Sequence, residues 1–182
     1  MKHADARGPV SFVANVARLP HKGLPVVIDA DDRQRAALAG EHELLSVERY
    51  RAELLVAPWK RNGVKVSGRV EADITQACIV TLDPVAAHID EPVEALFLPE
   101  QSKLGRQGFE GGGEIVLDAD GPDSPETFSG NTIDVGALAE QFFGLAIDPY
   151  PRKAGASVEA AGDTEPAESE FQQKLRSLLG KS

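Results

Sequence analysis

The fold is decided by "VKVSGRVEADI", residues 64–74, in which apolar and polar side chains alternate along the whole stretch. The apolar positions are Val64, Val66, Val70, Ala72 and Ile74. The polar positions between them are Lys65, Ser67, Arg69, Glu71 and Asp73. A period of two is typical of a β-strand with one face buried and the other in water. Gly68 breaks the apolar series and is expected to mark a bulge or a twist point.

A partner strand is expected immediately before this stretch, over residues 46–59, "SVERYRAELLVAPW". It alternates in the same way and is expected to stop at Pro58. Its apolar face consists of Tyr50, Ala52, Leu54 and Val56. The intervening "KRNG" (60–63) contains an Asn-Gly pair, which favours a hairpin turn because both residues tolerate positive φ. The sequence therefore predicts an antiparallel hairpin.

Further strands are expected on both sides of this hairpin. Residues 24–28, "LPVVI", form a short apolar run, and residues 87–99 alternate again after a turn at 82–85. Pro92 lies within the second of these strands and indicates an edge position or an irregularity. A short strand is also expected at 114–117.

Two segments have the pattern of helices. Residues 29–40 favour a short helix that begins at Asp31 or Asp32 and ends at Gly40. Residues 132–151 contain the best helix, capped by Asp134 and ended by Pro149. Its expected apolar stripe consists of Val135, Leu138, Phe142 and Leu145.

Antiparallel strands with a few helices packed on one side predict an α+β fold, with a sheet that could be barrel-like. Residues 1–153 are expected to form this single domain. Residues 154–169 are read as a disordered acidic linker, since they contain no basic or aromatic residue. Residues 170–182 are read as an amphipathic C-terminal tail that forms a short helix on the domain or on a partner. The apolar side chains of that tail are Phe171, Leu175, Leu178 and Leu179.

Charge is distributed unevenly along the chain, whose net charge is −10. Residues 1–69 carry twelve Lys and Arg against eight Asp and Glu, whereas residues 70–182 carry seven against twenty-one. An acidic protein as a whole is not attracted to nucleic acid, so any RNA contact requires a local basic surface. The absence of a long apolar run and the single cysteine lead us to expect a cytoplasmic protein with no membrane segment.

Cys78 is the candidate for nucleophilic or metal chemistry. A nucleophilic thiol needs a base and a lowered pKa, and the four histidines occur in no catalytic signature. If the strand 64–74 continues, Cys78 shares the parity of Val70 and Ile74 and faces the core, where free cysteine is commonly buried. The buried interpretation is favoured over the nucleophile.

Two other clusters carry weak signals. The carboxylates Asp118, Asp120 and Asp123 do not have the spacing of a calcium loop and are read as a solvated acidic turn. The glycine-rich segment 100–113 lacks the Lys-Ser/Thr end of a phosphate-binding loop.

The predicted hairpin would gather basic side chains on one surface. These candidates for RNA or partner binding are Arg49, Arg51, Trp59, Lys60, Arg61, Lys65 and Arg69. A patch of this kind is suited to phosphate. The same residues alternate with Glu48, Glu53 and Glu71, so an ordinary solvated strand face explains them equally well.

The strands around "GRVEADITQACIVTLDPV" (68–85), together with "LAIDPYPRK" (145–153), resemble the alphaproteobacterial type of the YceD-like large-subunit ribosomal RNA accumulation proteins. The likeness extends over about residues 10–153. It implies a non-enzymatic factor in accumulation of 23S ribosomal RNA, with no catalytic residues and no cofactor. Many members have a Cys-x-x-Cys-like pair that could hold a metal, but here Thr81 occupies the second position, and one thiolate cannot make a four-ligand site.

Three functions remain open at this point, and the third of them is a thiol enzyme that uses Cys78. In the first, the basic hairpin contacts ribosomal RNA or an assembly intermediate of the large subunit. In the second, the chain is a protein-only adaptor that binds a basic partner, such as a ribosomal assembly protein, through its acidic half and its tail. The sequence does not indicate an oligomeric state.

Overall fold

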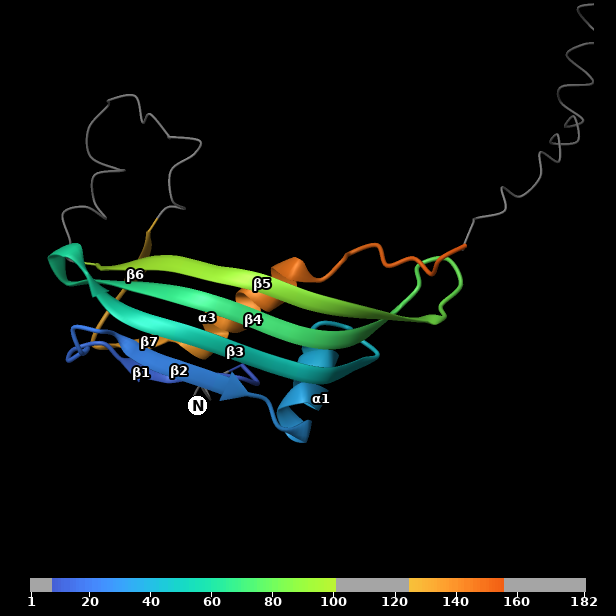
Figure 1. Ribbon diagram of the computed structural model, residues 1–182, viewed down its shortest axis with the longest axis horizontal. Helices are drawn as coiled ribbons and strands as arrows, with labels where there is room; N and C mark the ends of the chain where they lie inside the picture. Colours follow the sequence, from blue (N-terminus) through green and yellow to red (C-terminus); the bar gives the residue numbers. More distant parts are fainter. Residues whose placement is uncertain (1–7, 101–124, 156–182) are drawn as a thin grey trace, which may run out of the picture.

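A five-stranded sheet is the main element of the computed structural model, which describes residues 8–100 and 125–155 (Figure 1). The strands lie in the order β2 (Leu24–Asp29), β3 (Ser46–Trp59), β4 (Gly63–Ala77), β5 (Pro84–Pro99) and β6 (Glu126–Phe128). The first four are antiparallel neighbours, and β6 pairs in parallel with β5. A separate two-stranded sheet pairs β1 (Val13–Asn15) with β7 (Thr132–Asp134).

The α+β class is confirmed, but within the described ranges the sheet does not close into a barrel. Strands β2 and β6 form its two edges and do not pair with each other. Pro92 lies where β5 pairs with β4 alone, because β6 contacts β5 only along Phe97–Pro99. Among the described strands, none pairs with this part of β5 on its other side, and such an edge tolerates a residue without an N–H, as the sequence suggested.

The β3–β4 hairpin forms as predicted, with Tyr50 opposite Ala72 and Val56 opposite Val66. Pro58 does not stop β3, which continues to Trp59 opposite Gly63. The turn is one 3₁₀ turn, η1 (Lys60–Asn62), in which Asn62 has a φ of 61°. Gly63 has a φ of −74°, so only the asparagine of the Asn-Gly pair uses the left-handed region.

Gly68 is not a bulge, since the register passes through it from Leu54 on one side to Val93 on the other. A Cβ at this position would overlap the carbonyl oxygen of Glu53 and come within 2.8 Å of the Leu54 Cα. Glycine is therefore required for the close approach of β3 to β4. The register shift lies instead in β3, between Val47 and Arg49.

The first helix, α1 (Asp32–Glu41), begins where the sequence predicted. The Asp31 side chain accepts from the Gln34 N–H at 2.8 Å, and the Gln34 side chain accepts from the Asp31 N–H at 3.0 Å, which completes a capping box. The helix does not end at Gly40 but runs one residue further, because the N–H of His42 still donates to Leu38.

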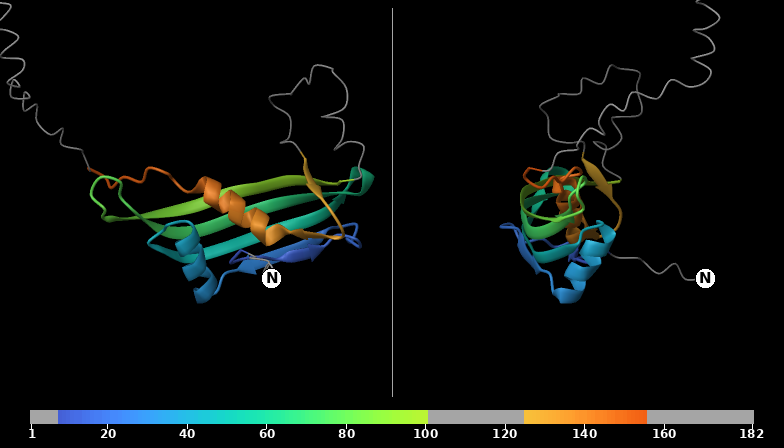
Figure 2. Two further views of the ribbon diagram at one scale, coloured as in Figure 1. Left: turned by 180° about the vertical axis from the view of Figure 1, so that it is seen from behind. Right: turned by 90° about the vertical axis from the view of Figure 1, so that its right-hand side faces the viewer.

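The second helix, α3 (Val135–Ala146), lies across the concave face of the sheet (Figure 2). Asp134 caps it as predicted, accepting from the Ala137 N–H at 3.0 Å and from the Ser11 hydroxyl at 2.5 Å. The helix therefore begins at Val135, directly after β7 (Thr132–Asp134). The helix ends before Pro149 is reached.

The predicted stripe of α3 was only half right. Val135 and Leu138 are buried, but the stripe continues through Ala139 and Phe143, while Leu145 is 77% exposed. Apolar residues occur almost all round this helix, so periodicity alone could not select the buried side. Packing selects the buried side. The centroid of the Phe143 ring lies 5.4 Å from that of Tyr50 and 5.1 Å from that of His42, both in edge-on geometry.

A polar cluster lies where α1, α3 and β3 meet. His42 Nε2 and the Tyr50 hydroxyl are buried without a hydrogen-bond partner, and Glu140 Oε1 lies 3.5 Å from His42 Nε2. Burial, with Glu41 as a second cause, raises the pKa of Glu140 to about 7. Burial also lowers the pKa of His42 and raises that of Tyr50.

Several expected features lie outside the described residues. They are the glycine-rich segment beyond residue 100, the strand at 114–117, the carboxylates at 118–123, most of the linker and the whole tail.

Glu140→Gln should change how stability depends on pH. The native carboxyl keeps its proton up to a pKa of about 7, whereas an unfolded glutamate releases it near 4.5. The stabilisation is therefore present at low pH and is lost as pH rises through 7. We expect the unfolding free energy of the wild type to fall by about 2 kcal/mol more than that of the variant between pH 5 and 8.

Urea unfolding at a series of pH values measures this difference. The lowered pKa of His42 makes the unfolding free energy rise with pH below about pH 6.5, which opposes the effect of Glu140. Both variants keep His42, so Glu126→Gln, which changes an exposed glutamate, serves as the control. If the unfolding free energies of Glu140→Gln and the control change equally with pH, the raised pKa of Glu140 is contradicted.

Candidate nucleic-acid interface

Four of the predicted basic residues lie on the outer face of the sheet, opposite the face that α3 covers. Arg49 and Arg51 come from β3, and Lys65 and Arg69 come from β4. Their shared face follows from strand parity, because their even-numbered neighbours form the core. The hairpin therefore gathers these four side chains as the sequence predicted.

Each of these four cations has a carboxylate beside it. The pairs are Arg49–Glu71 at 3.1 Å, Arg51–Glu53 at 2.6 Å, Arg51–Asp29 at 3.3 Å, Lys65–Glu94 at 2.6 Å and Arg69–Asp90 at 3.0 Å. Exposed pairs of this kind add little stability, but they cancel one another's charge. A phosphate approaching the middle of this face would meet five carboxylates against four cations, which weakens its attraction.

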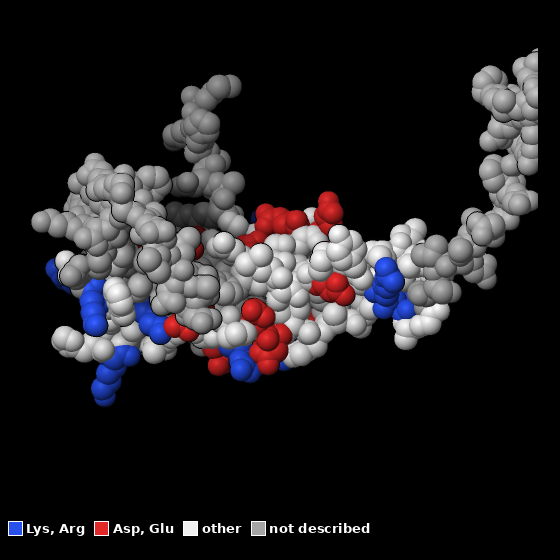
Figure 3. All heavy atoms as spheres, turned by 90° about the horizontal axis from the view of Figure 1, so that it is seen from above, with Lys and Arg blue, Asp and Glu red and all other residues white. Residues whose placement is uncertain are grey.

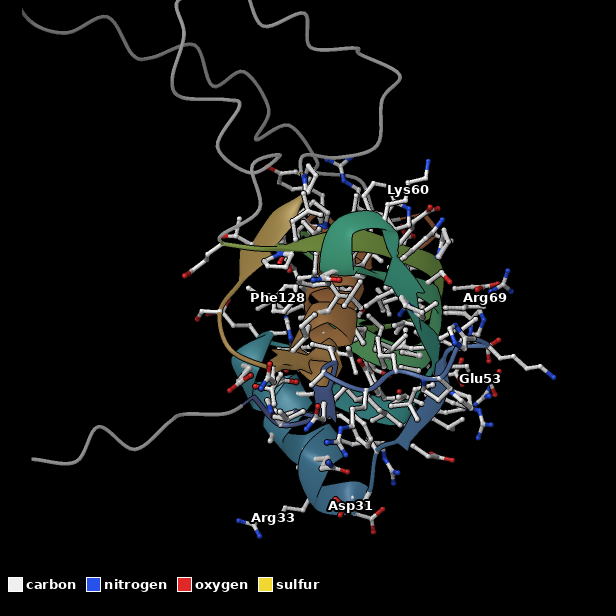
Figure 4. All side chains as sticks on the ribbon, turned by 90° about the vertical axis from the view of Figure 1, so that its left-hand side faces the viewer. Asp31, Arg33, Glu53, Lys60, Arg69 and Phe128 are labelled. Atoms are coloured by element: carbon white, nitrogen blue, oxygen red, sulfur yellow. The ribbon has the colours of Figure 1, made fainter. Side chains whose placement is uncertain are left out.

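The turn of the hairpin differs from the strands that lead to it. Lys60 is exposed, and within residues 8–100 and 125–155 it takes part in no ion pair. Figure 4 shows Lys60 at the end of the hairpin, whereas Arg69 and Glu53 lie along the flank of the sheet. Trp59 beside it is 36% exposed, and the backbone of Arg61 belongs to the same turn.

The loop between β1 and β2 adds two cations that sequence reasoning missed. Gly23, at a φ of 82°, donates to Pro20 and turns the chain into β2, where Leu24 pairs with Val56. Arg18 precedes this turn and Lys22 lies within it. Both are exposed and take part in no ion pair in the described part of the chain.

Figure 3 shows Lys and Arg side chains gathered at the end of the molecule that holds the η1 turn in Figure 1. We call this surface the basic end and define it as Arg18, Lys22 and Lys60. The loop residues lie in no periodic pattern, and only the β2–β3 register brings them to this end. A predicted pairing of residues 24–28 with the end of β3 could have found them.

Cys78 is fully buried, as its parity predicted, although β4 ends at Ala77 and the cysteine opens the following turn. Its Sγ accepts from the Lys153 N–H at 3.4 Å. That hydrogen bond, with further ones from Thr81 and Val80, lowers the pKa of the thiol to about 6. A lowered pKa favours the thiolate, but a buried sulfur has no access to substrate.

The surroundings of Cys78 are those of a structural corner. The turn is closed by the N–H of Cys78 donating to Asp83 at 2.8 Å, and Ile79 donates to Pro151 at 3.0 Å. No described histidine hydrogen-bonds to the thiol. Among the described residues, no three His, Cys, Asp or Glu side chains are placed to share a metal ion.

The described helices include none that is long and apolar enough to cross a membrane.

The molecule is an α+β protein with one covering helix, a charge-paired outer face and a basic end. A family model described as Large ribosomal RNA subunit accumulation protein YceD matches residues 66–177, more than half of the chain.

The chain therefore belongs to the YceD family, as its resemblance indicated. Membership supports a role in accumulation of the ribosomal RNA of the large subunit. Searches of the curated proteins and of the solved structures gave no match.

Cys78 should resist alkylation while the protein is folded. Its pKa of about 6 would make an accessible thiol react quickly at pH 7.5, but the sulfur is fully buried. We expect iodoacetamide to label the native protein at least about 100-fold more slowly than the protein in urea, because labelling requires local opening. Intact-mass spectrometry over time measures both rates, and equal rates would show that the thiol is open to solvent.

Proposed function

We propose that the chain supports large-subunit ribosomal RNA accumulation by binding RNA, or an RNA-containing assembly intermediate, through its basic end. The observation that carries this proposal is that Arg18, Lys22 and Lys60 have no carboxylate partner among the described residues. Unpaired cations supply most of the affinity of a protein for phosphate. Trp59 adds an exposed aromatic face on which a base could stack.

This proposal narrows the predicted set of basic residues. Trp59, Lys60 and Arg61 remain, and Arg18 and Lys22 are added to them. Arg49, Arg51, Lys65 and Arg69 contribute less, because a neighbouring carboxylate balances each of them. Phosphate contact there would have to break an ion pair first.

We also propose that the factor acts without catalysis and without a cofactor, in the cytoplasm where ribosomal RNA is made. Two observations support this. The one thiol is buried, and no described histidine bonds to it. Binding alone can protect an RNA or hold an assembly intermediate, so the role that the family name describes requires no catalytic group.

A protein-only adaptor is the second candidate, and the charge-paired outer face favours it. A surface that alternates carboxylates with cations is suited to another charged protein surface rather than to a uniform row of phosphates. In this case the acidic half of the chain and the tail residues Phe171, Leu175, Leu178 and Leu179 would provide the contacts.

Neutralising the basic end should weaken RNA binding more than neutralising the outer face. The test compares Arg18→Gln/Lys22→Gln/Lys60→Gln with the matched control Arg49→Gln/Arg51→Gln/Arg69→Gln, which removes the same charge. We expect roughly a tenfold loss of affinity for the first and a salt slope reduced by about 2, with little change for the control. Fluorescence anisotropy with large-subunit ribosomal RNA at several salt concentrations measures both quantities.

The same two variants are then expressed in growing cells, and the ratio of large-subunit to small-subunit ribosomal RNA is measured. Only the basic-end variant should lower it. Thermal unfolding checks that both variants are folded. Equal losses for the two variants would contradict the assignment of the site. Negligible RNA binding by the wild type at low salt would contradict RNA binding itself and favour the adaptor.

A further inference from the structure

Three large apolar side chains are exposed at the end of the molecule opposite the basic end. Ile79 and Leu82 belong to the turn between β4 and β5, and Tyr150 belongs to the segment that follows α3. Their exposed fractions are 44%, 76% and 70%. The N–H of Ile79 donates to Pro151 at 3.0 Å, so the turn and the segment lie side by side (Figure 1). We call these three residues the apolar end.

Side-chain contacts hold the two segments of the apolar end together. The Gln76 side chain donates to the Asp148 carbonyl at 2.8 Å, and the Lys153 ammonium contacts the Asp83 carboxylate at 3.0 Å. Leu82 has a φ of 60°, a conformation that leucine rarely adopts. Its side chain is exposed and contributes nothing to the core, while its N–H donates to Cys78 and closes the turn. Fixed and exposed apolar side chains are typical of a binding surface.

We propose that the apolar end is the docking site of the C-terminal tail of the same chain, residues 170–182. The described chain leaves the fold at this place, because Lys153 is fastened to Cys78 and Asp83 two residues before Gly155. The tail spaces Phe171, Leu175 and Leu178 for one helical face. Such a short stretch is marginal as a helix alone in water and needs an apolar surface on which to pack.

The tether favours the chain's own tail over a second copy. Residues 156–169 are the fourteen residues between the described fold and the tail. Fourteen residues span at most about 50 Å, which is ample to return to the adjacent apolar end. A short tether gives the tail an effective concentration on the order of millimolar at this site, well above any usual protein concentration. The family match also continues to residue 177, so it includes the turn and most of the tail in one unit.

Photocrosslinking of the full chain tests the docking. Leu82 is replaced by the photoreactive residue benzoylphenylalanine, and the matched control carries the same residue in place of Leu55, which is exposed on the outer face. Equal amounts of isotopically light and heavy chains are mixed before irradiation, so that mass spectrometry separates crosslinks within a chain from those between chains. We expect crosslinks from position 82 to residues 170–182 of the same chain, at least about fivefold above the control.

A second variant confirms the contact. Leu178→Ser/Leu179→Ser leaves the described fold untouched and should reduce the position-82 crosslink to the control level. Mixed light–heavy crosslinks would show that a second copy occupies the site and overturn the proposal. Crosslinks to other segments, or none, would overturn it as well. The proposal is independent of RNA binding, because the basic end plays no part in this measurement.

Discussion

The close approach of β3 to β4 at Gly68 is the constraint on which the rest of the structure depends. No side chain fits there, because a Cβ would overlap the Glu53 carbonyl oxygen. The two strands can therefore pair over almost their whole length, from Val47 opposite Ile74 to Trp59 opposite Gly63. A larger residue at position 68 would separate the strands in the middle of the core, since Val66 and Val70 on either side are fully buried.

The length of this ladder separates the two surfaces that we assign to binding. The η1 turn and the β1–β2 loop lie at one end of β3 and β4, while the Cys78–Asp83 turn and the segment after α3 lie at the other. Between them, the outer face is occupied by cross-strand ion pairs. Charges that oppose each other across strands cancel. Lys60 in the η1 turn and Lys22 in the β1–β2 loop have no such partner among the described residues. The same geometry that builds the sheet therefore decides where a phosphate could bind.

Much of the sheet could be predicted because its signal is local. Period-two alternation located β3, β4 and β5, and the Asn-Gly pair located the turn. The buried side of α3 could not be found in this way, since an apolar helix has no marked face until it meets the sheet around Tyr50. The position of Arg18 and Lys22 near the hairpin turn was missed for a similar reason, because it depends on pairing between β2 and β3. The ion pairs also required the register, which side-chain type alone does not supply.

The lone thiol is best explained by the corner in which it lies. Two segments far apart in sequence, the Cys78–Asp83 turn and residues 148–153, meet there without a disulfide. The sulfur accepts the N–H of Lys153 at 3.4 Å. A thiol is small enough for the core and polarisable enough to accept this bond, so its value here is structural: it fastens the segment that leads from α3 to the tail.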